Sequence, residues 1–123
     1  MHLAHLGLVV GDEQRSRRFY ERWFGFDAGP SWRAEDGTLF LRDADGFDLA
    51  LHAGEPGALP GFFHFGFRLP DPDAVRALLG RLAEAGVAVV ERHDEPAYVS
   101  LKCLDPDGYV VGGLLGAGHA GVT

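Results

Sequence analysis

The sequence lacks several features that would assign it to other classes of protein. Its 123 residues include one cysteine, Cys103, so no disulfide can form within the chain. No apolar run approaches the roughly 20 residues that a membrane-spanning helix needs. The N-terminus, MHLAHLGLVV, has neither the basic flank nor the cleavage site of a signal peptide. We therefore expect a cytoplasmic protein whose single thiol is reduced and buried.

Positive charge is also scarce. The 11 basic residues are outnumbered by 18 acidic ones, which gives a formal net charge of −7. This excess of negative charge opposes binding to polyanions, so neither nucleic acid nor an anionic membrane is expected as a partner. A content of 46% hydrophobic and 24% charged residues is typical of a globular domain. Small molecules and other proteins remain as partners.

The sequence contains one internal repeat. Residues 5–10, HLGLVV, match residues 64–69, HFGFRL, in the pattern His, apolar, Gly, apolar, any residue, apolar. Further along the chain, DADG at residues 43–46 recurs as DPDG at residues 105–108. Two motifs that recur in the same order indicate the duplication of one module.

Each copy predicts a strand, a helix and then three more strands. The first helix is expected between an N-cap at Asp12 and a glycine end at Gly25, and the second opens at Pro72 and Asp73 and ends at Gly86. The three later strands are predicted at residues 26–33, 37–42 and 46–52 in the first copy, and at 87–93, 98–104 and 108–115 in the second. Asp-rich, Gly-containing turns separate the last two strands of each copy.

These elements predict an α+β fold of two tandem βαβββ modules, with curved mixed sheets around a cavity and the helices outside. We expect one domain, with module 1 at residues 1–53 and module 2 at residues 62–116. A Gly- and Pro-rich linker at residues 54–61 joins the modules, and the small, patternless residues 117–123 predict a disordered tail.

The two βαβββ modules, the opening HLGLVV, the helix end FYERWFGF and the late DPDGYVV resemble the vicinal oxygen chelate superfamily over nearly the whole chain. This superfamily contains glyoxalases, bleomycin resistance proteins and extradiol dioxygenases. The resemblance implies the fold and a homodimer. Its members include isomerases, lyases, ring-cleaving dioxygenases, epoxide-opening resistance enzymes and metal-free drug-binding proteins, so the reaction stays open.

In metal-using relatives, the first strand of each module contributes a histidine and the last strand a glutamate. Carried over residue by residue, the resemblance places His5 and His64 at the histidine positions. The glutamate positions fall on Ala50 and Gly112, which cannot ligate a metal through their side chains. Two imidazoles and a carboxylate would hold Fe, Mn, Ni or Zn with open positions for a substrate, whereas two imidazoles alone bind weakly.

Two other residues of the first module are candidates to replace the missing carboxylate. Asp48 and His52 lie two positions either side of Ala50, hence on the same face of a strand. If either ligates a metal, the site keeps three protein ligands. If neither does, His5 and His64 line a polar cavity without a metal.

Three functions therefore remain open. The first is a metal-dependent dioxygenase, isomerase or lyase, with no catalytic residue assigned beyond the metal ligands. The second is a metal-free protein that sequesters a drug or metabolite in an aromatic cleft, and the third is a catalytically disabled relative that only folds and dimerises. The candidate substrate-binding residues are Trp32, Asp48, His52, Tyr98 and Ser100, and the aromatic cleft would add Phe40 and Phe63.

The C-terminal run Gly112 to Gly116 is unusual for a closing strand, because adjacent glycines weaken pairing. Relatives often end here in a sequence such as Glu-Val-Tyr-Trp-Glu. The residues present are compatible with a one-base insertion after Val111, which would have replaced a glutamate at position 112. Ordinary divergence is the alternative, and the codons of the gene decide between the two.

Overall fold

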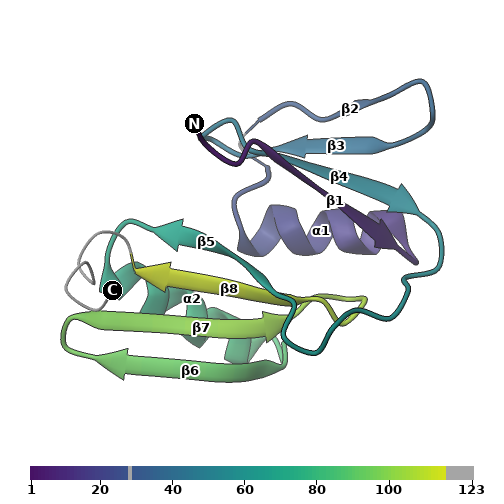
Figure 1. Ribbon diagram of the computed structural model, residues 1–123. Coiled ribbons are helices and arrows are strands. Elements are labelled where there is room, and N and C mark those ends of the chain that lie inside the picture. The colour runs from purple at the N-terminus through teal and green to yellow at the C-terminus, as the bar shows by residue number, and fades with distance from the viewer. Residues whose placement is uncertain (28, 116–123) are drawn as a thin grey trace. The chain divides into compact units, whose positions relative to one another are not determined.

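The computed structural model describes residues 1–27 and 29–115. The chain divides into two compact units, Met1–Leu59 (unit 1) and Pro60–Thr123 (unit 2), and each follows the predicted order βαβββ (Figure 1). The predicted α+β class and the two tandem modules are therefore confirmed. The expected tail at residues 117–123 lies outside the described residues. Neither described helix is long and apolar enough to cross a membrane.

Unit 1 is a four-stranded mixed sheet with one helix. Its elements are β1 (His5–Val10), α1 (Glu13–Trp23), β2 (Trp32–Arg33), β3 (Leu39–Arg42) and β4 (Asp48–Ala53). The strand order is β1-β4-β3-β2, with β1 parallel to β4 and the other pairs antiparallel. The parallel first pair follows from the helical crossover that joins the first strand to the rest of the sheet.

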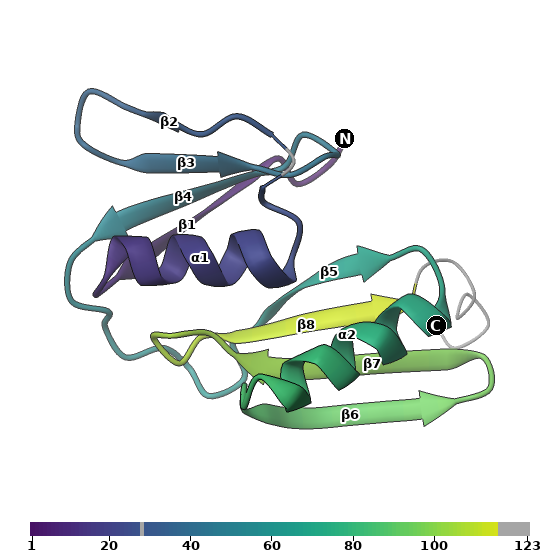
Figure 2. The same ribbon diagram turned by 180° about the vertical axis from the view of Figure 1, so that it is seen from behind.

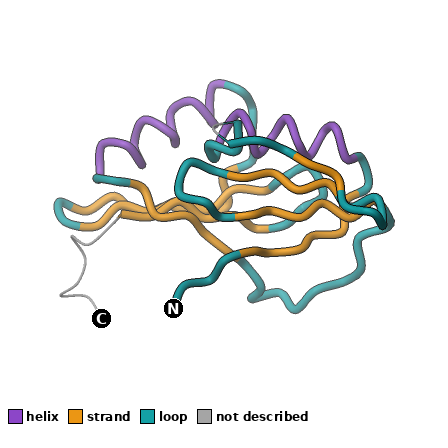
Figure 3. The backbone as a smooth tube through the Cα atoms, turned by 90° about the horizontal axis from the view of Figure 1, so that it is seen from above, coloured by secondary structure: helices purple, strands orange, loops and turns teal. Residues whose placement is uncertain are grey.

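Unit 2 repeats this topology. Its elements are β5 (Phe65–Leu69), α2 (Pro72–Glu84), β6 (Val89–Glu95), β7 (Tyr98–Leu104) and β8 (Val110–Leu115). The strand order is β5-β8-β7-β6, again with one parallel pair, β5 with β8. Seen from behind, α2 crosses one face of its own sheet (Figure 2), and in the view from above each helix lies on one side of the strands of its unit (Figure 3).

The helix starts follow the predicted signals. Asp12 caps α1 by accepting a hydrogen bond from the Arg15 amide at 3.1 Å. Helix α2 begins at Pro72 as predicted, and its N-cap is the preceding Asp71, which accepts from the Ala74 amide at 2.8 Å. Pro72 fits the first turn because its missing N–H has no partner to lose there.

The Asp–Gly turns of the two units are the same structure. Oδ1 of Asp43 accepts hydrogen bonds from the amides of Asp45 and Phe47, each at 2.9 Å. Oδ1 of Asp105 accepts from the amides two and four residues later at the same distances. The glycines that end both turns have positive φ angles, 86° and 89°, which glycine adopts without strain. The hairpin prediction is confirmed, and so is the repeat.

The predicted strand at residues 26–33 is mostly wrong, because β2 contains only Trp32 and Arg33. Phe26 is held by the helix end instead, with its amide donating to the Tyr20 carbonyl at 3.3 Å and its ring buried. Pro30 interrupts the following segment since it has no N–H for a strand ladder. In this segment Phe26 therefore packs in the core, and strand pairing begins only at Trp32.

Each sheet buries the face that meets its helix. In unit 1 the buried strand residues are Leu8, Val10, Leu39, Leu41, Leu49 and Leu51, against Phe19, Tyr20 and Trp23 of α1. In unit 2 they are Val99, Leu101, Cys103 and Val111, against Val75, Leu78 and Leu82 of α2. Strand β1 alternates accordingly, with His5, Gly7 and Val9 exposed and Leu8 and Val10 buried. We call this second face of each sheet its open face.

Candidate functional site

Strand pairing lines up equivalent rows of residues across the two open faces. We call the row that contains the expected carboxylate position the middle row. In unit 1 the middle row is Gly7, Ala50, Phe40 and Trp32. In unit 2 it is Gly66, Gly112, Lys102 and Glu91. The two rows start alike, on a glycine and a small residue, and differ completely in their last two members.

A cavity of about 360 Å³ lies on the open face of unit 2. Its polar lining comes from His64, Glu91, His93, Tyr98, Ser100 and Lys102, with Gly66 and Gly112 in the same wall. The structure therefore brings together three residues that the sequence nominated, His64, Tyr98 and Ser100. The other three polar residues were missed, although Lys102 shares the strand alternation of Tyr98 and Ser100 and could have been found from it.

An ion pair occupies the middle row of unit 2. Nζ of Lys102 lies 2.9 Å from Oε2 of Glu91, and Lys102 is also the direct cross-strand partner of Gly112. The hydrogen bond from Lys102 lowers the pKa of Glu91, and its positive charge adds to this effect, with smaller contributions from His93 and His64. Glu91 is therefore ionised at neutral pH, and its carboxylate is already bound by an ammonium group.

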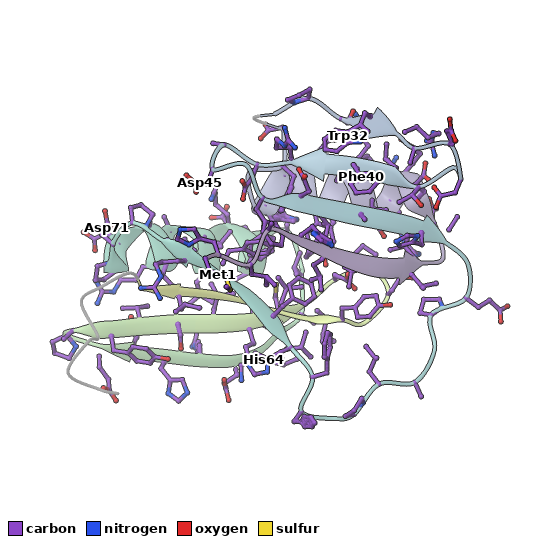
Figure 4. The ribbon with its side chains drawn as sticks, turned by 45° about the horizontal axis from the view of Figure 1, so that its top comes forward. Met1, Trp32, Phe40, Asp45, His64 and Asp71 are labelled. Carbon is purple, nitrogen blue, oxygen red and sulfur yellow. The ribbon has the colours of Figure 1, made fainter. Side chains whose placement is uncertain are left out.

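His64 stands at the edge of this cavity, immediately before β5 (Figure 4). Its Nδ1 lies 3.0 Å from the carbonyl oxygen of Phe62. A carbonyl can only accept, so Nδ1 carries the hydrogen and donates it, which leaves Nε2 of the neutral ring as an acceptor. His64 therefore contributes to the cavity lining an imidazole whose Nε2 can accept a hydrogen bond.

The open face of unit 1 carries an aromatic and ionic cluster. Trp32 and Phe40 stack with ring centroids 5.0 Å apart and planes 6° from parallel (Figure 4). The Arg42 guanidinium lies 4.9 Å from the Trp32 ring and binds Asp48 through two hydrogen bonds of 2.7 and 3.0 Å. Asp48, nominated as a substitute metal ligand, is therefore held by a bidentate arginine.

The two nominated histidines of unit 1 lie at opposite ends of its parallel strand pair. His5 is exposed at the start of β1 and is the cross-strand partner of Asp48. His52, near the end of β4, shares a hydrogen bond of 3.1 Å between its Nδ1 and Oγ1 of Thr38. Phe63 packs at 6.3 Å from Phe65 and does not line the cavity of unit 2. The four aromatic residues expected to share one cleft are thus divided between the units, with only Tyr98 at the cavity.

The residues of unit 2 do not fit a divalent metal. Among residues 1–27 and 29–115, no three His, Cys, Asp or Glu side chains are grouped to hold a metal ion. Crowding does not require a glycine at position 112. A Cβ added there would lie no closer than 3.4 Å to any atom outside its chain neighbours, which is an ordinary contact distance. Glu91, the carboxylate of that row, is already bound by the Lys102 ammonium and is not offered to a cation.

Residues 2–112 match the sequence model of the Glyoxalase/Bleomycin resistance protein/Dioxygenase superfamily. The chain belongs to this family. A trivalent organoarsenical cleaving enzyme of Bacillus sp. (strain MD1) is 30% identical over 115 residues, which cover 88% of this chain and 69% of that protein.

Two solved structures show the same fold. A possible glyoxalase from Bacillus cereus has a TM-score of 0.75 and 28% identity, covering 93% of this chain and 98% of its own. The second is a mutant of the fosfomycin resistance protein FosX from Listeria monocytogenes, in complex with Mn(II) and a dihydroxypropylphosphonic acid. It has a TM-score of 0.74 and 18% identity, and the match covers 91% of this chain and 87% of the FosX chain. At that identity the FosX structure supports the fold alone.

Proposed function

We propose that this chain binds a small polar organic molecule in the cavity of unit 2 without requiring a divalent metal. The observation that carries the proposal is the Lys102–Glu91 ion pair, which lies in the row where metal-using relatives carry a carboxylate. The ammonium supplies a fixed positive charge that does not depend on a bound metal. This is the metal-free binding function among the alternatives left open by the sequence.

The lining residues suit a ligand that carries an anionic group. In the proposed complex Lys102 binds a carboxylate or phosphonate oxygen, while Ser100 and Tyr98 contribute hydroxyl groups from the same strand. His64 presents Nε2 as an acceptor to a hydroxyl of the ligand. Trp32, Asp48 and His52 belong to unit 1, and their role in binding stays a prediction, as do the homodimer and the cytoplasmic location.

Calorimetric titration tests the proposal with 1S,2S-dihydroxypropylphosphonic acid, the anionic ligand of the FosX complex, as the probe. We expect equal affinity in EDTA and in MnCl2, and affinity about tenfold weaker for Lys102→Met, a loss of about 1.4 kcal/mol. Arg76→Met is the matched control, because Arg76 pairs with Asp73 and Asp94 outside the cavity. Binding that needs Mn(II), or that survives Lys102→Met unchanged, contradicts the proposal.

A metal-dependent lyase, isomerase or dioxygenase is the second candidate. It is favoured by the 30% identity to the organoarsenical cleaving enzyme and by histidines at both matched positions, His5 and His64. Elemental mass spectrometry on protein purified without a metal-affinity tag distinguishes it, with Gly112→Glu measured in parallel. Near-stoichiometric Fe, Mn, Ni or Zn in the native chain favours this candidate, whereas an empty native chain favours metal-free binding.

A further inference from the structure

The Lys102–Glu91 ion pair presents both of its charges to the cavity of unit 2. Both residues line this cavity, and their side chains are 29% and 45% exposed, respectively. An ammonium group has three N–H donors, and a carboxylate has two acceptor oxygens. The contact of 2.9 Å joins Nζ to Oε2, which leaves the other donors of the ammonium and the other carboxylate oxygen to a ligand. A ligand can therefore bind both charges without breaking the pair.

These two opposite charges are the permanent charges among the described residues that line the cavity. The lining also has two imidazoles, those of His64 and His93, and an imidazole is mostly neutral at about pH 8. A simple anion in the cavity is attracted by Lys102 and repelled by Glu91, and the repulsion offsets part of the attraction because the two charges lie 2.9 Å apart. The field of such a pair favours a ligand that itself carries two opposite charges.

The strand pairing indicates how the two ends of such a ligand are oriented. Lys102 pairs with Gly112 of β8 on one side and with Glu91 of β6 on the other. Gly112 and Gly66 belong to the cavity wall and have no side chains, so there is room for an anionic group next to Lys102. Ser100, two residues away on the same strand, adds a hydroxyl donor. The opposite end of the ligand then points to Glu91, on the edge strand β6.

We propose that the ligand of this cavity is a zwitterion, in which a short carbon chain joins an ammonium group to a carboxylate or phosphonate. Lys102 binds the anionic group and Glu91 binds the ammonium, so Glu91 determines specificity in addition to pairing with the lysine. This inference rests on the proposed binding function of unit 2 and adds the second charge of the ligand to it. An anion without an ammonium group meets the same lysine but leaves Glu91 as a repulsive group.

Calorimetric titration in EDTA at about pH 8, where imidazoles are mostly neutral, compares two probes that differ in one group. 2-Aminoethylphosphonic acid carries an ammonium group where 2-hydroxyethylphosphonic acid carries a hydroxyl. We expect the native protein to bind the amino compound about tenfold more tightly, because the ammonium adds a full charge to the hydrogen bond that Glu91 accepts. Equal affinity, or tighter binding of the hydroxy compound, overturns the zwitterion inference and leaves metal-free anion binding intact. If neither probe binds, the inference fails, and binding of 1S,2S-dihydroxypropylphosphonic acid decides whether the proposed function fails with it.

Glu91→Gln separates the role of the carboxylate from that of the cavity, because it keeps the shape of the side chain and removes its charge. We expect the amino compound to bind this variant about tenfold more weakly and the hydroxy compound about threefold more tightly, so that the preference for the amino compound is lost. Glu84→Gln is the matched control, since Glu84 lies exposed in α2 and does not line the cavity. A purely structural role of Glu91 would change the binding of both probes in the same direction. That result, or a preference that survives in Glu91→Gln, overturns the inference.

Discussion

In unit 1 the middle row ends on two stacked rings, Phe40 and Trp32, whereas in unit 2 the same row ends on the ion pair of Lys102 and Glu91. The strand order, the single parallel pair and the Asp-centred turns are identical in the two units. Backbone pairing and turns must be kept for the module to fold, while side chains of the open face contribute little to the core. The open faces are therefore where the copies could acquire different binding chemistry.

The helix-facing layers differ in a second way. Unit 1 packs aromatic residues, with Tyr20 contacting Phe19 at 5.1 Å and Phe26 at 6.1 Å, both edge-on. Unit 2 uses aliphatic residues such as Leu78 and Leu82. Both helices bury three apolar side chains, and because those of the shorter α1 are aromatic, each of them can bury more surface. Each unit has its own core, which makes their stabilities separately measurable.

The largest effect is expected from Phe26→Ala, which removes a side chain that is 1% exposed and costs about 3–5 kcal/mol of unfolding free energy. Two probes separate the units, because both tryptophans, Trp23 and Trp32, lie in unit 1 and the single cysteine, Cys103, lies in unit 2. In Phe26→Ala we expect the urea concentration at the midpoint of the tryptophan fluorescence transition to fall, relative to the native protein, by more than the midpoint measured by Cys103 labelling. Equal falls would mean that the two cores unfold as one.

A carboxylate placed at the two equivalent positions should have unequal effects. Ala50→Glu buries a charge beside Phe40, where Asp48 has already engaged the nearby arginine, so we expect a loss of about 3 kcal/mol. Gly112→Glu also places a charge at a buried position, but its direct cross-strand partner is Lys102, whose ammonium can bind the new carboxylate as well as Glu91, so we expect a smaller loss of about 1 kcal/mol. Urea unfolding followed by both probes measures the difference. Equal costs would remove the distinction between the two middle rows.

A smaller effect is expected on the ionisation of Glu91. Its pKa is lowered in the folded protein, chiefly by the hydrogen bond from Lys102, so Lys102→Met should raise the pKa toward the ordinary value of a glutamate side chain. The stabilisation that comes from this lowered pKa is present above the unfolded pKa and is lost as pH falls through the folded value. The stability difference between native and variant should therefore shrink as pH falls below the unfolded pKa of Glu91 and disappear below the folded one. NMR titration of the Glu91 carboxyl carbon measures the pKa directly.

The sequence predicted the fold because the repeat, the caps and the Asp–Gly turns are local signals. Asp12, Asp43 and Asp105 each bond an amide within four residues, so their spacing alone indicates the structure. The prediction for residues 26–33 failed because the Phe26 amide bonds the Tyr20 carbonyl at the end of α1 and its ring packs in the core, and strand periodicity does not distinguish a buried residue of this kind from a strand residue.

The site was predicted less completely, for a related reason. Tyr98, Ser100 and Lys102 occupy alternate positions of β7, between buried residues, and all three line the cavity. The partnership of Lys102 with Glu91 depends on register across a hairpin that contains an irregularity between Val89 and Glu91, which shifts the pairing. A shift of this kind changes which residues face each other, and nothing in the sequence marks it.

The smallest expected effect is on the reactivity of the one thiol. Burial, reinforced by the nearby Asp105 charge, raises the pKa of Cys103 to about 11, so little thiolate forms at pH 8. We expect iodoacetamide to modify the native protein far more slowly than the urea-unfolded chain, because the thiolate is the reacting species. Leu82→Ala, which loosens the same core by about 2–5 kcal/mol, should speed labelling, whereas Phe26→Ala in the other unit should change it less. Labelling that responds equally to both variants would show that opening of unit 2 requires opening of unit 1.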